Sequence, residues 1–397
     1  SLIEIYTDLG DHDTADQWVE HARTSFERLG DAPSLELTLL STIGILRQEQ
    51  GRYPEPLQVQ LRALELLPDE GDEIRRAKAH NNLGATYDYA GEHARAIEHF
   101  ERALALYEAR RGPDHPDNVY PLANLAWARM EVGELDRAEP LLHRAIDLQR
   151  RANTSDTYAL ATLLSHLGSL HAQRGQHPQA LATYEEALTV AEAEFGPEHP
   201  MVGNVVMNMA GERMGLGQPA QAQQTYERAL GILERALGPQ HDDVALARSN
   251  LADLLVTRGQ PAEALEQARQ AIAIYEALGL GSDRSSLVLP LTVTGAALVA
   301  LERAPEALAP LERAVRIAAR DDVSPRERAD TMLALADALW ATGHDHLRAH
   351  QLALDARLAL ASHPEASEAT ARIEAWLSAH PMPDDPAPDD PPPTPAR

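Results

Sequence analysis

The sequence predicts an all-α protein, a solenoid built from about nine helix–turn–helix repeats. Three observations lead to this prediction. The 397 residues are 44% hydrophobic but only 4% aromatic, and Ala, Leu, Glu and Arg, which favour helices, are abundant. A glycine recurs at nearly constant intervals along the chain. A small–large–small pattern of side chains follows most of these glycines.

The recurring glycine marks the turn before the second helix of each pair. The series is Gly10, Gly51, Gly91, Gly133, Gly175, Gly217, Gly259, then Glu302 in the equivalent place, and finally Gly343. Successive steps are 41, 40, 42, 42, 42, 42, 43 and 41 residues. Each unit is therefore predicted to contain a first helix, a glycine turn, a second helix and a loop.

Second helices are expected to pack closely against their neighbours. In most units an alanine stands five residues after the glycine, a larger residue four further on, and an alanine three beyond that. Examples are Ala96, Phe100, Ala103; Ala138, Leu142, Ala145; and Ala180, Tyr184, Ala187. Residues at i, i+4 and i+7 share one helix face, so the alanines would let another helix approach while the larger residue fills the gap.

First helices precede each glycine, in segments such as NNLGATY (81–87), ANLAWAR (123–129) and SHLGSLH (165–171). Prolines in the first turn of several second helices support the boundaries, because a missing N–H costs little there. These prolines are Pro178, Pro219, Pro261 and Pro305.

This pattern resembles the tetratricopeptide repeat, with its Leu-Gly, Tyr, Gly, Ala, Phe/Tyr and Ala positions. The 42-residue period and the loops GPDHPD (112–117), GPEHP (196–200) and GPQHDD (238–243) are similar to the kinesin-light-chain type of that family. The resemblance covers about residues 1–360 and implies a right-handed α-solenoid that binds a protein or peptide partner.

Several positions depart from the family pattern. Pro56 stands where alanine is usual, Glu302 replaces the turn glycine, and the last unit has one residue inserted after Gly343. Arg129 and Arg213 replace the aromatic residue found at Tyr87 in an earlier unit. We therefore expect the repeats that contain these arginines to pack differently from the others.

The solenoid is predicted to span residues 1–379, with a truncated first repeat and an irregular last repeat. Ser1 falls inside a first helix of the pattern, which suggests a fragment of a longer protein. Residues 380–397 contain mainly proline and aspartate and are predicted to be a disordered tail.

Composition restricts the classes of partner. A formal net charge of -26 argues against binding to nucleic acid, because phosphate contacts require clustered Lys and Arg. The sequence has no cysteine, and neither a signal peptide nor a membrane span is predicted. We expect a cytoplasmic protein, and the excess of arginine over lysine suggests a bacterial source with a GC-rich genome.

No catalytic, cofactor-binding or metal-binding motif is found, so the predicted fragment is not an enzyme. His344, His346 and His350 have a spacing that could face one metal ion, but no further ligand completes the set. His115, His199 and His241 recur at matching loop positions, which favours a role in capping or loop closure.

The resemblance implies that one asparagine per first helix contacts the backbone of a bound peptide. In this sequence these residues are Asn82, Asn124, Asn208 and Asn250, with His166 in the equivalent place once. An amide both donates and accepts hydrogen bonds, so such a series can hold an extended peptide. The alternative interpretation is that these amides form hydrogen bonds between helices.

Neighbouring positions would determine which side chains are accepted. We predict an apolar patch centred on Trp127, to which flexible methionines contribute. Its other members are Tyr120, Met130, Asn204, Met207 and Met214. Alternatively, these side chains fill the wall against adjacent repeats. Lys78 and Arg75 are the only clear basic candidates near the wall, so the predicted partner is apolar or basic and not acidic.

The sequence thus predicts a non-catalytic protein-interaction module. The ending IEAWLSAHP and the alanine-rich pattern are also similar to the C-terminal repeat regions of bacterial Ser/Thr protein kinases, which would make this a recruiting or regulatory arm. The alternatives are the ligand-sensing array of a multidomain NTPase or protease-linked regulator, a free-standing adaptor, and an enzyme with a site in the solenoid channel.

Overall fold

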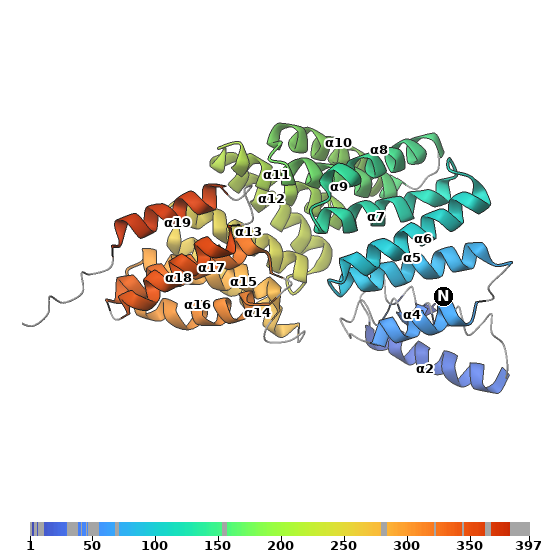
Figure 1. The fold of residues 1–397 in the computed structure, drawn as a ribbon, viewed down its shortest axis with the longest axis horizontal. Helices are drawn as coiled ribbons and strands as arrows, with labels where there is room; N and C mark the ends of the chain where they lie inside the picture. The colour runs from blue at the N-terminus through green and yellow to red at the C-terminus, as the bar shows by residue number, and fades with distance from the viewer. Residues whose placement is uncertain are drawn as a thin grey trace, which may run out of the picture. The chain divides into compact units, whose positions relative to one another are not determined.

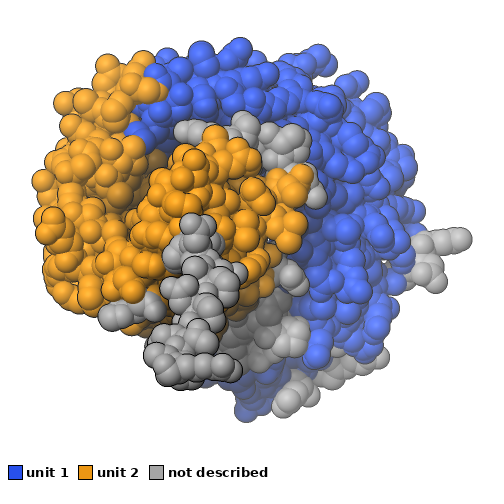
Figure 2. All heavy atoms as spheres, turned by 60° about the vertical axis from the view of Figure 1, so that its left-hand side comes forward, with its two compact units in different colours: residues 1–216 blue, residues 217–397 orange. Residues whose placement is uncertain are grey.

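The computed structural model describes residues 2–3, 6, 12–29, 39–40, 42–44, 46, 55–67, 71–152, 157–278, 284–320, 323–343, 345–361 and 367–381. These residues form helices and no strands, which confirms the all-α solenoid. The chain divides into two compact units, Ser1–Leu216 and Gly217–Arg397, coloured separately in Figure 2. The predicted turns at Gly10 and Gly51, and the tail after residue 381, lie outside the described residues.

The described helices of the first unit begin with two second helices, α2 and α4, and from α4 onward they alternate between second and first members of each pair. They are α2 (His12–Leu29), α4 (Glu55–Glu65), α5 (Glu73–Tyr89), α6 (His93–Arg111), α7 (Val119–Glu131), α8 (Leu135–Ala152), α9 (Thr157–Gln173), α10 (His177–Phe195) and α11 (Pro200–Gly215). A short 3₁₀ helix, η1 (Pro116–Asn118), leads into α7. Helices α5 and α6 lie side by side as one such pair (Figure 1).

The second unit continues the alternation. Its helices are α12 (Pro219–Leu237), α13 (Asp242–Thr257), α14 (Pro261–Ala277), α15 (Val288–Ala300), α16 (Ala304–Ala318), α17 (Pro325–Thr342), α18 (His346–Ala359) and α19 (Ser367–Ala379), with the 3₁₀ helix η2 (Ser285–Leu287) before α15. Arg372 of α19 forms an ion pair with Asp330 of α17, which stands 42 residues earlier. Helix α19 therefore takes the place of one more first helix in the series.

First helices pack against one another within each unit. In the first unit α5 contacts α7, α7 contacts α9, and α9 contacts α11. In the second unit α13 contacts α15 and α15 contacts α17. The second helices α6, α8 and α10 of the first unit, and α14 and α16 of the second, each pack mainly against their own first helix and the next one. The first helices thus form a continuous row in each unit, and that row positions the candidate site.

The small–large–small pattern has the predicted structural basis. A Cβ atom placed on Gly168 of α9 would lie 2.7 Å from the Tyr184 ring of α10, and one on Gly84 would lie 2.7 Å from the Phe100 ring. Real Cβ atoms do not approach this closely, so both glycines are needed for the observed helix spacing. Ala126 and Leu142 occupy the same two positions in the intervening repeat and are both fully buried.

In the repeats whose turn is described, from Gly91 to Gly343, the turn before the second helix uses the left-handed backbone conformation. Gly133 has φ of 77°, and Glu302, which replaces the glycine one period after Gly259, has φ of 60°. Glu302 is the only described non-glycine residue with positive φ. The turn therefore has the same conformation at this position, although the positive φ is unfavourable for Glu302 because it has a Cβ atom.

Arg129 packs differently from its counterpart Tyr87, as predicted. The Tyr87 ring stacks on His99 with ring centroids 5.4 Å apart. The Arg129 guanidinium instead forms ion pairs with Glu101 and Glu134, although the residue is only 5% exposed. A buried guanidinium requires such partners, because an unpaired charge away from water is costly.

Candidate functional site

The candidate site is the face of α5, α7, α9 and α11 that carries the predicted asparagine row. We call this surface the inner face; it comprises Asn82, Asn124, His166 and Asn208, the residues four positions before each of them, and the residues three positions after. All four row residues are partly exposed, whereas the adjacent Leu83, Leu125, Leu167 and Met209 are buried. The row therefore borders the core without being enclosed by it.

One member of the row bonds to the neighbouring helix. The Asn124 amide of α7 donates from Nδ2 to Oδ1 of Asn81 on α5, at 3.1 Å. Within the described residues, the side-chain amides of Asn82 and Asn208 make no such bond. An amide has two donor hydrogens and two acceptor sites, so Asn124 retains hydrogen-bonding capacity beyond the bond to Asn81. Asn124 thus forms the interhelical hydrogen bond of the alternative interpretation, while the side-chain amides of Asn82 and Asn208 remain available to a peptide, as the first interpretation requires.

Trp127 and His166 form the centre of the inner face. Their ring centroids lie 4.8 Å apart and the ring planes are inclined by 38°. The Trp127 side chain is partly buried and packs against the core cluster beneath it. Burial lowers the pKa of His166 to about 4, so the imidazole is neutral at pH 7. Its Nδ1 atom is buried and has no hydrogen-bond partner among the described residues.

The methionines lie deeper than the sequence suggested. Met130 is 2% exposed and belongs to the core cluster, and Met207 is 6% exposed. Met214 is partly exposed. Each step of three residues along a helix rotates the side chain by about 60° away from the starting face, so counting 124, 127, 130 ends in the core. Met130 and Met207 support the inner face from below and offer little surface to a partner.

Exposed tyrosines extend the inner face, and sequence reasoning named only one of them. Tyr120 is 53% exposed and precedes Asn124 by four residues, as predicted for the patch. Tyr89, seven residues after Asn82, is 63% exposed, and Tyr158, four residues before Thr162, is 51% exposed. The i+7 step would have identified Tyr89, whereas Tyr158 lies eight residues before His166 and its ring contacts Phe195 of α10. Asn204, also predicted for the patch, is partly exposed on α11.

Carboxylates lie at the end of the first helices nearest the glycine turns. Asp88 Oδ1 is 2.7 Å from Nδ1 of His93, and desolvation raises the pKa of Asp88 despite this contact. Desolvation also raises the pKa of Glu131, with His93 opposing the shift and Asp88 adding to it. These carboxyl groups would gain from a cation brought by a partner.

The inner side of the second unit contains the last asparagine of the row. Asn250 is partly exposed on α13. Desolvation raises the pKa of Asp253, three residues further on; Asp330 of α17 adds to the shift, and Arg372 and Arg326 oppose it. The Trp376 indole Nε1 of α19 donates to Asp337 at 3.3 Å.

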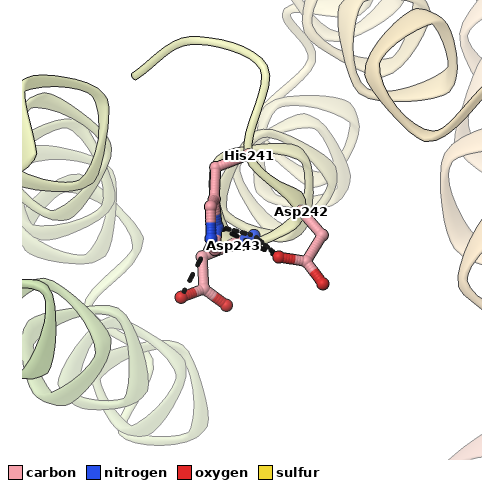
Figure 3. A group of neighbouring side chains, drawn as sticks. All are labelled: His241, Asp242 and Asp243. Atoms are coloured by element: carbon pink, nitrogen blue, oxygen red, sulfur yellow. Dashed lines mark hydrogen bonds and ion pairs between the residues drawn. The ribbon is translucent and has the colours of Figure 1, made fainter. Parts of the chain in front are cut away.

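The loop histidines cap helices, as predicted. Nδ1 of His115, His199 and His241 accepts a hydrogen bond from the backbone N–H two residues further on, at 3.1, 3.2 and 3.2 Å. His241, Asp242 and Asp243 are the only described residues grouped closely enough to hold a metal ion (Figure 3). Since the same cap occurs in two repeats that lack the acidic pair, helix capping explains His241 fully.

The histidines near the C-terminus, whose spacing alone could face one metal ion, make other contacts or lie outside the described residues. The His346 ring stacks on Trp340 with centroids 4.1 Å apart, and His350 is partly buried. His344 lies outside the described residues.

Comparison with known families identifies the repeats. The family model described as Tetratricopeptide repeat matches residues 75–151, 159–211 and 204–277. The chain carries tetratricopeptide repeats. Their 42-residue spacing is that of kinesin-light-chain-like arrays, and the fold is of the protein-interaction type. Among the described residues, no helix of this array combines the length and apolar character needed to cross a membrane.

Similar proteins share this repeat architecture. Tetratricopeptide repeat protein 19, mitochondrial, of Rattus norvegicus is 33% identical over 103 residues, which cover 25% of this chain and 27% of that protein. Protein KINESIN LIGHT CHAIN-RELATED 2 of Arabidopsis thaliana is 26% identical over 174 residues, covering 44% of this chain and 25% of that protein. The tetratricopeptide array therefore spans about a quarter of the length of these two curated relatives.

One solved structure extends the similarity over the whole array. The crystal structure of a Rap protein complexed with Competence and Sporulation Factor has a TM-score of 0.59 to this chain, with 13% sequence identity. The alignment covers 95% of this chain and 94% of the other. At this level of identity the comparison establishes a common fold.

Proposed function

We propose that the inner face of the first unit binds an extended segment of a partner protein and that the array itself catalyses no reaction. The contact between the Trp127 and His166 rings carries this proposal. It presents a partly exposed indole, fixed by packing from below, on a face that also exposes Tyr120. Rigid aromatic side chains at the centre of a surface supply much of the binding energy in protein interfaces.

The asparagine row supplies the second element of recognition. Asn82, Asn124 and Asn208 are partly exposed and stand on three first helices of one continuous row. Their amides can pair with both the N–H and C=O groups of a peptide backbone, while the partner's side chains contact Trp127 and the tyrosines. The face would thus recognise an extended chain with an apolar anchor residue.

The charges favour an apolar anchor accompanied by a basic residue. Asp88 and Glu131 have raised pKa values because both carboxyl groups are desolvated. A lysine or arginine of the partner, placed near them, would stabilise their charged forms. The Rap protein, which has the same fold, was solved in complex with Competence and Sporulation Factor. This complex supports the proposal that an array of this fold binds a partner.

Affinity capture with the whole chain as bait tests the proposal. Proteins retained by the wild type should be lost with Trp127→Ala and with the double variant Asn124→Ala/Asn208→Ala. Thr189→Ala, an exposed residue of α10, is the matched control and should retain them. A partner that all four proteins capture equally would exclude the inner face as its binding site.

We also propose that the array recruits partners for a larger cytoplasmic signalling protein, with a bacterial Ser/Thr kinase as the preferred context. The sequence similarity described above supports this context. Reading the gene upstream of Ser1 tests it directly. A glycine-rich loop, a strand lysine, and HRD and DFG motifs would support the kinase. A P-loop, a protease pair or no catalytic domain would favour the sensor or adaptor alternatives.

A further inference from the structure

A groove lies in the second unit, between the second helices α12 and α14. It has a volume of 510 Å³, and Leu230 and Gly231 of α12 are partly exposed in it, while Leu251 and Leu255 of α13, each 3% exposed, close its floor. We call it the outer groove. Leu251 and Leu255 are on a different side of α13 from Asn250 and Asp253, because residues one and five positions after Asn250 point about 100° and 140° around the helix. The outer groove is therefore separate from the inner side of this unit.

Gly231 is one of the residues that line this groove. It lies in the interior of α12, where glycine destabilises a helix by about 1 kcal/mol relative to alanine. A Cβ at this position would meet only the side chain of Arg235, with Nη1 at 3.2 Å and Cζ at 4.0 Å. The equivalent residues, 14 positions after the turn glycine in other repeats, are Thr189 and Ala273. Packing within the repeat thus does not require this glycine, unlike Gly168.

The rim of the groove carries carboxylates without a cationic partner. Glu227, Glu263 and Glu266 accept hydrogen bonds from the amides of Gln223, Gln260 and Gln270, at 2.8, 3.2 and 2.6 Å. None of the three forms an ion pair within the described residues. Glu234, which also lines the groove, does pair with Arg248, and elsewhere in this unit Glu276 pairs with Arg313, Glu306 with Arg303 and Glu312 with Arg348.

We propose that the outer groove binds an amphipathic helix of a partner protein, with aliphatic residues facing the floor and Lys or Arg on both flanks. The apolar floor and the unneutralised rim together specify this chemistry. A helix pairs its own backbone groups, which suits a floor of aliphatic side chains. An extended strand would need backbone hydrogen bonds that Leu230, Leu251 and Leu255 do not offer through their side chains.

A designed peptide provides the probe. It has about 18 residues, enough to form a helix when bound, with leucines at i, i+3, i+4 and i+7 and lysines on the flanks. A scrambled peptide of identical composition controls for general attraction to this acidic chain. Binding of each fluorescent peptide to the whole chain is measured by anisotropy at about 0.15 M salt, which screens long-range attraction.

Three kinds of variant locate the site. Gly231→Leu fills the groove without changing charge and should weaken binding at least tenfold, while Thr189→Leu, at the equivalent exposed position of α10, should not change it. Glu227→Lys/Glu263→Lys reverses the charge of the rim at two exposed positions, one on α12 and one on α14, and should also weaken binding without filling the groove. Trp127→Ala should bind the peptide as the wild type does, which separates this surface from the inner face.

The proposal is overturned if the wild type shows no saturable binding, or if the scrambled peptide binds as tightly as the amphipathic one. It is also overturned if neither Gly231→Leu nor the rim reversal weakens binding. Circular dichroism confirms that each variant keeps its helices.

Discussion

The indole of Trp127 and the imidazole of His166 belong to consecutive first helices, and their ring centroids lie 4.8 Å apart. The contact joins two repeats at the surface proposed to receive a partner. His166 replaces the asparagine of the row, so the face gains an aromatic contact where it gives up one amide. Burial keeps this imidazole neutral, so the centre of the face carries no charge at pH 7.

Acidification should destabilise the first unit partly through His166. The pKa of His166 is about 4 when folded, against an ordinary value of 6.5. Between these values the unfolded chain binds a proton that the folded chain excludes, so the free energy of unfolding falls as the pH falls from 6.5 to 4. The loss is up to about 3 kcal/mol from this residue.

Urea unfolding of the wild type and His166→Gln at pH 7.5 and 4.5 measures the effect. The variant should lose less stability on acidification. The variant will still lose the stability that depends on neutral His80, whose pKa is lowered to about 4 by burial and by nearby His99, Arg102 and Arg76. Identical pH dependence in both proteins would show that His166 is protonated without penalty.

Glu302→Gly should stabilise the second unit by up to about 1 kcal/mol. Glu302 has φ of 60°, a conformation that is strained for residues with a Cβ. Relief of that strain is opposed by the greater freedom of glycine in the unfolded chain. Glu302→Ala retains the Cβ and serves as the control in a thermal unfolding series. A melting temperature for Glu302→Gly at or below that of Glu302→Ala would show that the turn is unstrained.

Gly168→Ala should destabilise the first unit by about 1–3 kcal/mol, because the new methyl group would overlap the Tyr184 ring. Adding Tyr184→Leu should recover part of the loss, since the preceding repeat pairs Ala126 with Leu142. Chemical denaturation of the two single variants and the double variant gives the coupling energy. Additive losses would mean that the two side chains do not restrict one another.

His241→Ala should cost about 1 kcal/mol of stability through loss of the cap on α13. His115→Ala and His199→Ala remove equivalent caps and should cost similar amounts. Asparagine at position 241 should restore most of the stability, because its side chain can accept the same N–H. A chelator-sensitive melting temperature that only His241→Ala abolishes would instead identify the group in Figure 3 as a metal site.

The repeat geometry could be predicted from the sequence because it rests on residues with a single structural role. Turn glycines such as Gly133, and Ala126 beneath Leu142, recur with the period of the fold. The binding face was harder to predict, because the burial of a side chain depends on small rotations around a helix. Met130 was expected on the surface and lies in the core, while Tyr89 was overlooked and is largely exposed.

Interactions that depend on one particular pair of repeats were also beyond sequence reasoning. The bond between Asn124 and Asn81 joins residues 43 positions apart, one more than the period, so the 42-residue alignment does not pair them. The space at Gly231 depends on what surrounds it in three dimensions, and its helix-interior position alone did not distinguish it from a tightly packed glycine.

The continuous row of first helices also determines the sequence spacing at which an extended ligand would meet successive helices. Helices α5, α7, α9 and α11 succeed one another in contact, and packed helices are typically about 8–10 Å apart. An extended chain advances about 3.3 Å per residue, so it would pass from one helix to the next every three residues or so. Partner sequences should accordingly show their preferred residues at every third position, a triplet pattern recognisable in a set of captured peptides.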